Sequence, residues 1–222
     1  MCGRFGVPFR GDELAAALDA QWRGEPLQGP RWNVAPTQHA PVLFLADGAR
    51  RLEMTRWGLI PSWAKDASIG SKMINARAET VAEKPSFRAA FRKRRCLVPM
   101  AGFFEWKRDG KDKVPHWIHP AAGPVLTVAG LWERWHPVGA EPVTTFTVLT
   151  TAANGFMAAL HERMPVIVAP AERDRWLDAE APEAELLALL RAAPDDLLAA
   201  HAVSTRVNDA RHDDAGLVEG RS

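Results

Sequence analysis

Short apolar and β-branched runs, separated by turn residues, make up most of the chain and predict strands. The clearest turn is Arg108-Asp-Gly-Lys111, because Asp-Gly is a strong hairpin signal between such runs. Strands are predicted at residues 41–46, 51–59, 96–107, 113–119, 125–135, 143–151, 164–168 and 202–207.

Helical patterns are fewer and shorter than the strand patterns. Residues that favour N-caps mark where several of them begin. Helices are predicted after Asp12, from the capping box Thr80-x-x-Glu83 through Phe91, from Asn154 to near His161, and at two places within 171–200. Strands joined by hairpins, with helices inserted and appended, predict an α+β fold with a mainly antiparallel sheet.

The chain length of 222 residues suits one domain, and no linker or internal repeat divides it. We therefore expect a single domain over residues 1–222. Its last part, from about 210 to 222, is expected to be a frayed tail, because chain ends are poorly ordered unless other segments hold them.

Composition narrows the class of protein. A hydrophobic fraction of 47% and a charged fraction of 25% are those of a globular chain. No apolar run is long enough for a transmembrane helix, and the N-terminus lacks the apolar region of a secretory signal. The two cysteines, Cys2 and Cys96, are too few for a disulfide scaffold. We expect a cytoplasmic protein with free thiols and no membrane contact.

The net charge of +1 hides an asymmetry. Residues 77–113 contain 11 basic and five acidic side chains, a net charge of +6, whereas residues 171–222 contain six basic and 12 acidic ones, a net charge of −6. The basic region suits a polyanion such as nucleic acid, but a solvated helix face would give the same pattern.

Aromatic usage is unusual, with nine Trp, nine Phe and no Tyr. Most of the Trp residues are interpreted as core residues whose indole N–H finds a partner. Trp63 is the exception, because it follows Pro61 in a loop-like segment where a large ring is expected to be exposed.

Cys2 has chemistry that no internal cysteine shares. Removal of Met1 would leave an α-amine (pKa about 7.7–8.0) beside a thiol (pKa about 8.5). The amine of such an aminothiol condenses with an aldehyde to an imine, and the thiol then closes a five-membered thiazolidine ring in an intramolecular step. Taken alone, a Cys at position 2 is better explained by chance in a disordered terminus.

Four other polar residues lie in apolar or constrained settings. Glu105 interrupts the apolar run AGFFEW, where an unpaired carboxylate is costly to bury, so it is either paired or a proton shuttle. Asn75 and Arg77 lie in INARAET, between a Gly/Ser loop and the capping box. His161 precedes Pro165 in HERMP, and a lone His is more often structural than catalytic. No spacing rule joins these positions into one site.

Common catalytic and metal-binding signatures are absent from the sequence. His116-x-x-His119 with Cys2 and Cys96 matches no strong zinc pattern. There is no GxSxG, P-loop or dinucleotide fingerprint. We expect no metal and no cofactor.

Several motifs together resemble one family. MCGR, RWNVAPTQ, RWGLIPSW, NARAET, RCLVPMAGFFEW, AGLWE, TVLTTAAN and HERMPVIV occur in this order, from Cys2 to about Asn208. Each motif is weak, but their order is specific, and the chain resembles the SOS response-associated peptidase (SRAP) family. The resemblance implies a single α+β domain with a barrel-like antiparallel core. It also implies binding of single-stranded DNA and covalent trapping of abasic sites by processed Cys2.

The resemblance also assigns roles residue by residue. Asn75 would position the Cys2 adduct, Glu105 would shuttle protons, and His161 would assist opening of the sugar ring and reversal of the crosslink. Positions implied to touch or line the DNA are Arg4, Asn33, Arg77, Thr150 and Arg163, with Pro36 and Trp63 as wedges beside the lesion. The imine would also permit β-elimination and strand cleavage, an AP lyase side activity.

The chain departs from the family at three aromatic positions. Phe104 and Trp32 stand where members often have Tyr, so the hydroxyl is missing, and Ala64 replaces a second aromatic beside Trp63.

Two other functions stay open. One is a thiol peptidase, acting on its own N-terminus through Cys2, with His161 as base and Asn75 as orienting group. The other is a non-catalytic reader of modified DNA that uses the basic region at 77–113. The expected partner is abasic single-stranded DNA, the expected state is a monomer, and the expected location is the cytoplasm, on the nucleoid when DNA is bound.

Overall fold

Five strands close into a barrel at the centre of the molecule. The pairings run from β11 to β10, β7, β4 and β5, and β5 returns to β11 as a parallel neighbour. The computed structural model describes residues 2–221. The barrel strands are β4 (His39–Ala46), β5 (Ala49–Trp57), β7 (Arg95–Met100), β10 (Leu126–Trp135) and β11 (Val143–Ala152). Three short strands extend this sheet: β2 (Gln21–Trp22) on β5, and β6 (Asn75–Arg77) and β12 (Arg163–Pro165) on β11.

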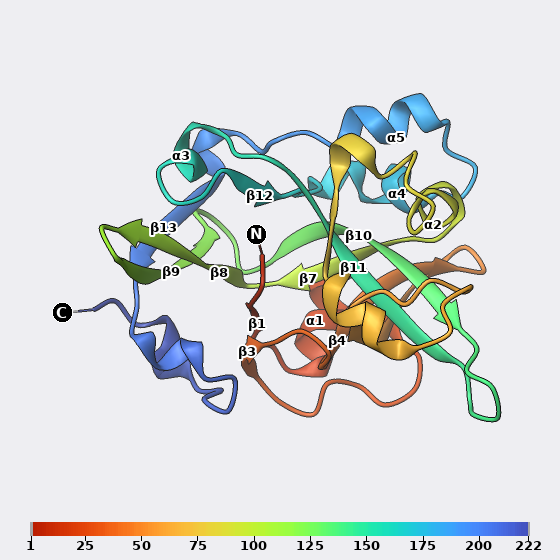
Figure 1. Ribbon diagram of the computed structural model, residues 1–222, viewed down its shortest axis with the longest axis horizontal. Coiled ribbons are helices and arrows are strands. Elements are labelled where there is room, and N and C mark those ends of the chain that lie inside the picture. Colours follow the sequence, from red (N-terminus) through yellow and green to blue (C-terminus); the bar gives the residue numbers. More distant parts are fainter. Residues whose placement is uncertain (1, 222) are drawn as a thin grey trace.

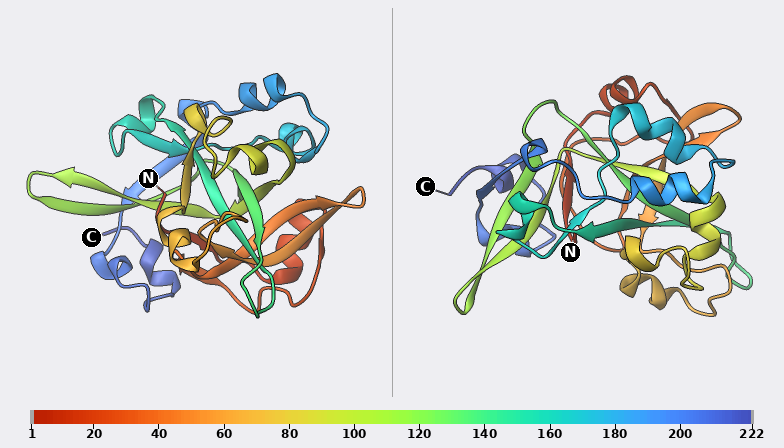
Figure 2. Two further views of the ribbon diagram at one scale, coloured as in Figure 1. Left: turned by 45° about the vertical axis from the view of Figure 1, so that its right-hand side comes forward. Right: turned by 90° about the horizontal axis from the view of Figure 1, so that it is seen from above.

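A second, five-stranded sheet lies beside the barrel in the order β13-β9-β8-β1-β3 (Figure 1). Its long hairpin β8–β9 projects from the body in both views of Figure 2. Gly110 takes the left-handed conformation (φ 59°) in the turn between Asp109 and Asp112, which confirms the predicted hairpin. The strands are β1 (Phe5–Val7), β3 (Arg31–Val34), β8 (Gly102–Asp109), β9 (Asp112–Pro120) and β13 (Leu198–Ala202). The predicted fold class, α+β with a mainly antiparallel, barrel-like core, is confirmed.

The five-stranded sheet separates two hydrophobic cores. Phe5, Phe103 and Ile118 belong to the main core, which fills the barrel, and the Phe5 ring packs edge-on against Trp57 with centroids 4.9 Å apart. Phe104 and its neighbours belong to a smaller core on the other face. Since successive strand residues point to opposite faces, Glu105 shares the barrel-facing side of β8 with Phe103. The strand alternation therefore directs this carboxyl group toward the interior between sheet and barrel.

Short helices cover the outside of the barrel. The helix α4 packs on β7, where the Trp176 indole donates a 2.8 Å hydrogen bond to the carbonyl oxygen of Cys96. Among residues 2–221, no helix has the length and apolar character needed to cross a membrane. The helices are α1 (Gly11–Leu18), α2 (Arg88–Lys93), α3 (Gly155–Ala158), α4 (Arg173–Leu177) and α5 (Glu183–Leu189).

Some predicted elements are shorter or displaced. The helix α1 begins at Gly11, so Asp12 lies in its first turn and is not the cap. The predicted helix from Thr80 is wrong: residues 78–80 form a 3-10 turn, and α2 starts only at Arg88. Pro85 explains the break, because proline disfavours helical backbone at the residue before it. The helix predicted to be capped by Asn154 is confirmed, since its side chain accepts the Met157 N–H at 2.8 Å.

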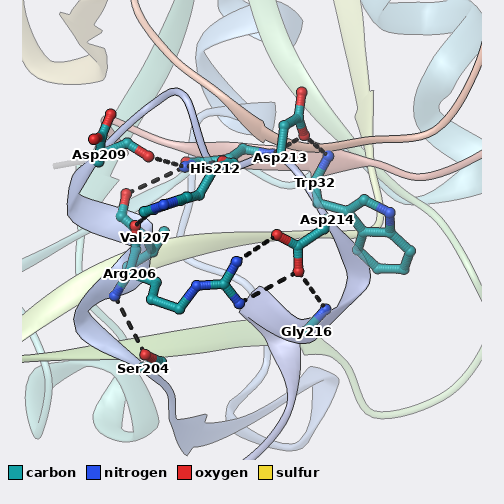
Figure 3. A network of polar contacts seen from close by, with 10 residues as sticks. Trp32, Ser204, Arg206, Val207, Asp209, His212, Asp213, Asp214 and Gly216 are labelled. Atoms are coloured by element: carbon teal, nitrogen blue, oxygen red, sulfur yellow. Dashed lines mark hydrogen bonds and ion pairs between the residues drawn. The ribbon is translucent and has the colours of Figure 1, made fainter.

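The C-terminal segment is held in place, contrary to the expected frayed tail. We call residues 204–218 the C-terminal strap. Leu217 in the strap is fully buried, and the carboxylate of Asp213 accepts the backbone N–H groups of Trp32 and Asn33 on β3 (Figure 3). The predicted last strand, 202–207, is also displaced, because β13 ends at Ala202 and residues 205–208 form a 3-10 turn. Local sequence pattern missed this packing because its partners lie about 180 residues away in the chain.

Candidate active site

Cys2 is fully buried in the main core, just before strand β1 of the five-stranded sheet. The segment is aligned on β8, because the Phe104 N–H donates to the carbonyl oxygen of Arg4 at 2.9 Å. The segment that carries Cys2 is therefore packed into the structure. The interpretation of Cys2 as a chance residue in a disordered terminus does not fit this packing. Met1 and Ser222 lie outside the described residues, and the expected removal of Met1 falls there.

Asn75 holds the backbone of Cys2. It begins β6, opposite Val148 on β11, and its Nδ2 donates to the carbonyl oxygen of Cys2 at 2.9 Å. Its Oδ1 is buried and accepts no hydrogen bond from residues 2–221. A buried acceptor without a donor is costly, so it marks a position where a bound molecule could supply one.

Glu105 lies close enough to Cys2 to change its acidity. Burial raises the pKa of the Cys2 thiol far above its ordinary value, and the negative charge of Glu105 raises it further. Glu105 itself is only 3% exposed. The thiol is therefore protonated at neutral pH, and any reaction of its sulfur needs a base nearby. The structure thus brings together three predicted residues from β8, β6 and the N-terminus.

His161 follows α3 and precedes β12. Its Nδ1 lies 3.0 Å from the backbone N–H of Arg163, from which it accepts, and 3.3 Å from the carbonyl oxygen of the same residue. This hydrogen bond fixes the orientation of the imidazole.

Arg163 is occupied by protein partners. Its guanidinium binds the Glu79 carboxylate with two hydrogen bonds of 3.0 and 2.9 Å, and it donates to the carbonyl oxygen of Thr150 at 2.6 Å. Hydrogen bonding from Arg163 lowers the pKa of Glu79. Thr150 is fully buried, and its Oγ1 also lies within 3.5 Å of this guanidinium. Glu79 was not singled out by the sequence, although it lies in the NARAET motif.

Arg4 and Asn33 form a second occupied group. One Arg4 nitrogen donates to Asn33 Oδ1 at 3.0 Å and to the carbonyl oxygen of Val207 at 2.8 Å. The Asn33 amide donates to three strap carbonyl oxygens, those of Val207, Asp209 and His212. Asn33 is fully buried, and its contact with DNA stays a prediction. Burial lowers the pKa of Arg4, and the charge of Asp209 opposes that change.

The remaining predicted DNA-contact residues lie at the surface. Arg77 is exposed, and its side chain makes no hydrogen bond or ion pair with residues 2–221, although its charge helps to lower the pKa of Glu79. Trp63 is 60% exposed, which confirms the expectation for this ring. Pro36 is half-buried in a turn next to Thr37, whose φ is 74°.

His116 is a further titratable neighbour of the site. It lies directly opposite Glu105 across the β8–β9 hairpin, and its Nδ1 is 3.0 Å from the carbonyl oxygen of Val114. The sequence suggested His116 only as a metal ligand, but counting back from the Asp109–Asp112 turn pairs it with Glu105. Within the described part of the chain, no three His, Cys, Asp or Glu side chains gather as a metal site would require.

Comparison with known proteins places this arrangement in one family. Residues 1–210 match the family model described as SOS response associated peptidase (SRAP). The abasic site processing protein YoqW of Bacillus subtilis is 39% identical over 222 residues, covering 99% of each chain. The abasic site processing protein HMCES of Gallus gallus is 35% identical, covering 96% of this chain and 76% of its own. A crystal structure of a protein from Bacteroides thetaiotaomicron has a TM-score of 0.91 and 27% identity over the full length of both chains. The chain therefore belongs to the SRAP family.

Proposed function

We propose that this protein processes abasic sites in single-stranded DNA by trapping them covalently on Cys2. The observation that carries the proposal is the enclosure of Cys2 between the Asn75 amide and the Glu105 carboxyl group. The relatives named abasic site processing proteins agree with it. No other aminothiol can form in this chain, because only a cysteine at the processed N-terminus has both groups on adjacent carbons.

The reaction has two bond-forming steps. After Met1 removal, the α-amine of Cys2 attacks the aldehyde of the open abasic sugar, and loss of one water gives an imine. The Cys2 sulfur then adds to the imine carbon while its proton is transferred to the nitrogen. The product is a thiazolidine that joins protein to DNA, and no oxidant or cofactor is consumed. Both steps gain rate because the reacting groups are held within one enclosed site.

Proton transfer falls to the neighbouring side chains. The raised pKa of the Cys2 thiol means that its proton must be removed as the sulfur attacks, and Glu105 is the carboxylate beside it. The same group would protonate the departing hydroxyl during imine formation. Asn75 would hold the Cys2 backbone, and its open Oδ1 would accept a hydrogen bond from the adduct. His161 would assist sugar-ring opening and crosslink release.

The DNA strand would pass over the exposed residues around this site. Arg77 offers an exposed guanidinium for phosphate, and Trp63 offers an exposed ring for stacking beside the missing base. Pro36 would serve as a second wedge. Arg163 would reach phosphate only by sharing or leaving Glu79, and Thr150 and Asn33 would act from the interior. AP lyase cleavage would follow if a base removed the sugar α-proton of the imine.

Peptidase chemistry is less well supported by the same geometry. A thiol peptidase needs a thiolate, whereas burial raises the pKa of Cys2 and the Glu105 charge opposes ionisation. In addition, the His161 Nδ1 already accepts the backbone N–H of Arg163, so this nitrogen is not open to act as the base that a thiol peptidase needs.

Mass spectrometry of the protein after incubation with abasic single-stranded DNA tests the proposal. A heat-stable adduct on Cys2, with the mass of the DNA minus one water, is expected for wild type. Cys2→Ala and Cys2→Ser should form none, although Cys2→Ala can still form a reducible imine. Cys96→Ala is the matched control, since Cys96 is equally buried but internal. A persistent adduct on Cys2→Ala would contradict the thiazolidine mechanism.

A further inference from the structure

The C-terminal strap is attached to the N-terminal part of the site by buried and hydrogen-bonded residues. Val207 and Leu217 are fully buried in the smaller core, against Phe104 and Trp117. The Trp106 indole donates to Asn208 Oδ1 at 2.8 Å. The strap therefore covers the face of β8 opposite to Glu105.

Two adjacent aspartates of the strap have different partners. Asp213 bonds to β3: its carboxylate accepts the N–H groups of Trp32 and Asn33 and pairs with Arg31. Asp214 bonds within the strap, to Arg206 at 2.7 Å and to the Gly216 N–H at 3.1 Å (Figure 3). Asp213 lies beyond residue 210, where the match to the family model ends.

The attached strap holds part of the Arg4 guanidinium. Of its five guanidinium N–H groups, three donate to Asn33 Oδ1 and to the carbonyl oxygens of Val207 and Asn208. The Nε–H and one N–H on Nη2 make no bond with the described residues. Donors on these two neighbouring atoms match the fork that binds two oxygens of one phosphate.

We propose that the C-terminal strap, fastened by Asp213, positions Arg4 for a phosphate next to the trapped sugar. This inference rests on the proposed function, and it makes Asp213 and Asn33 positioning residues. Asp213 fixes β3, β3 carries Asn33, and Asn33 with the strap carbonyl groups fixes one side of the Arg4 guanidinium. The opposite side is left to the DNA. Because Arg4 is two residues from Cys2, the phosphate it binds is adjacent to the reacting sugar.

The test compares Asp213→Asn and Asp213→Ala with the matched control Asp214→Ala, in a DNA-binding assay and in an adduct-formation assay. Binding of an undamaged thymidine oligonucleotide is followed by fluorescence anisotropy over a salt series. Adduct formation is followed with abasic single-stranded DNA and with 2-deoxyribose, which offers the same aldehyde and no phosphate. Thermal unfolding of each variant confirms that it is folded under the assay conditions. Asp213→Asn is included in case Asp213→Ala does not fold, because its amide keeps an oxygen that can accept the backbone N–H groups.

The Asp213 variants should weaken oligonucleotide binding roughly tenfold, the lower range for a hydrogen bond to a charged group. They should also lower the salt slope by about 0.7, the value for one phosphate contact on a single strand. Their rate with 2-deoxyribose should equal that of wild type, and Asp214→Ala should behave as wild type in every assay. On an Arg4→Ala background, Asp213→Asn should change the slope no further.

Three results would overturn the inference. One is a wild-type salt slope in folded Asp213 variants. Another is an equal loss of rate with 2-deoxyribose and with DNA, because the strap would then support the whole Cys2 site. The last is the same defect in Asp214→Ala. If wild type forms no adduct at all, the proposed function fails, but the salt slopes still decide whether Asp213 positions Arg4.

Discussion

The Asn75 Nδ2 lies 2.9 Å from the carbonyl oxygen of Cys2, to which it donates a hydrogen bond across 73 positions of sequence. This contact joins the reactive N-terminus to β6 and through it to the barrel strand β11. The barrel therefore holds Cys2 from one side, while the bond from Phe104 on β8 to Arg4 aligns the segment that follows it.

Replacing Asn75 tests this relationship. Asn75→Ala should cost about 0.5–1.5 kcal/mol of stability, the usual net value of one hydrogen bond. It should slow crosslinking more than the stability loss explains, because the amine of Cys2 would lose its alignment. Asn75→Asp keeps the shape but places an acceptor against the carbonyl oxygen, so its crosslinking rate should be lower still. Equal rates for all three proteins, measured by gel shift of abasic oligonucleotide, would show that Asn75 does not align Cys2.

The two buried thiols should make stability fall in alkaline solution. Burial raises the pKa of Cys2 and of Cys96 above that of an exposed thiol. Above about pH 9 the unfolded chain loses both thiol protons, whereas the folded chain keeps them. The free energy of unfolding should then fall with a limiting slope of about 1.4 kcal/mol per pH unit for each thiol. Below the pKa of an exposed thiol, both cysteines stay protonated in the folded and the unfolded chain. Their contribution to the pH dependence of stability then vanishes.

Urea unfolding between pH 8 and 10 measures this slope. The chain contains no Tyr, and Lys titrates mainly above this range, so the thiols dominate. Cys96→Ala should approach half of the wild-type slope. A slope that is the same in wild type and Cys96→Ala would mean that the Cys96 thiol ionises normally in the folded protein.

The sequence predicted the structure correctly where residues only a few positions apart determine it. The Asp-Gly turn set the register of β8 and β9, and Asn154 marked its helix, because turn and cap chemistry acts over a few residues. Closure of the barrel by the parallel pairing of β5 with β11 could not be read from pattern, because nothing local specifies it. The same holds for Asp213 on β3 and for the Glu79–Arg163 pair, whose partners are 180 and 84 positions apart. That Asn75 and Glu105 would act on Cys2 was indicated only by the family resemblance, and the structure has a hydrogen bond from Asn75 to Cys2 and a charge effect of Glu105 on its thiol.

Phosphate binding should depend on Arg77 more than on Arg163. Arg77→Ala should lower the salt slope for undamaged single strands by about 0.7, since it removes an exposed charge that, unlike Arg163, makes no direct ion pair with Glu79. Arg163→Ala should lower it less, because Glu79 already neutralises this guanidinium. Glu79→Gln should raise affinity and steepen the slope by freeing Arg163. Anisotropy over a salt series measures all three variants.

Arg88→Ala is the matched control for these variants, because Arg88 is exposed on α2, on the outside of the barrel. Its slope should equal that of wild type. If Arg77→Ala and Arg88→Ala lower the slope equally, binding is a general charge effect and Arg77 marks no DNA path. If Glu79→Gln leaves affinity unchanged, the ion pair does not restrain Arg163.

Glu105 and His161 should affect different steps of the reaction. Glu105→Gln keeps the shape of the side chain but removes proton transfer beside a thiol whose pKa is raised. Crosslink formation should slow by roughly 10²–10⁴, the full general acid–base contribution, and strand cleavage should be suppressed. His161→Ala should slow formation less and mainly slow release, because the group that assists sugar-ring opening also serves the reverse reaction.

Two time courses separate these roles: formation on abasic single-stranded DNA, and transfer of the finished crosslink to excess competitor. Glu133→Gln and His119→Ala are the controls, since Glu133 is a buried carboxylate paired with Arg94 and His119 is a half-buried imidazole on β9. Both should follow wild type. If Glu105→Gln forms crosslink at the wild-type rate and His161→Ala releases it normally, neither residue transfers protons. Glu105 would then act only by keeping the Cys2 thiol protonated, and its replacement should instead lower the pKa of that thiol.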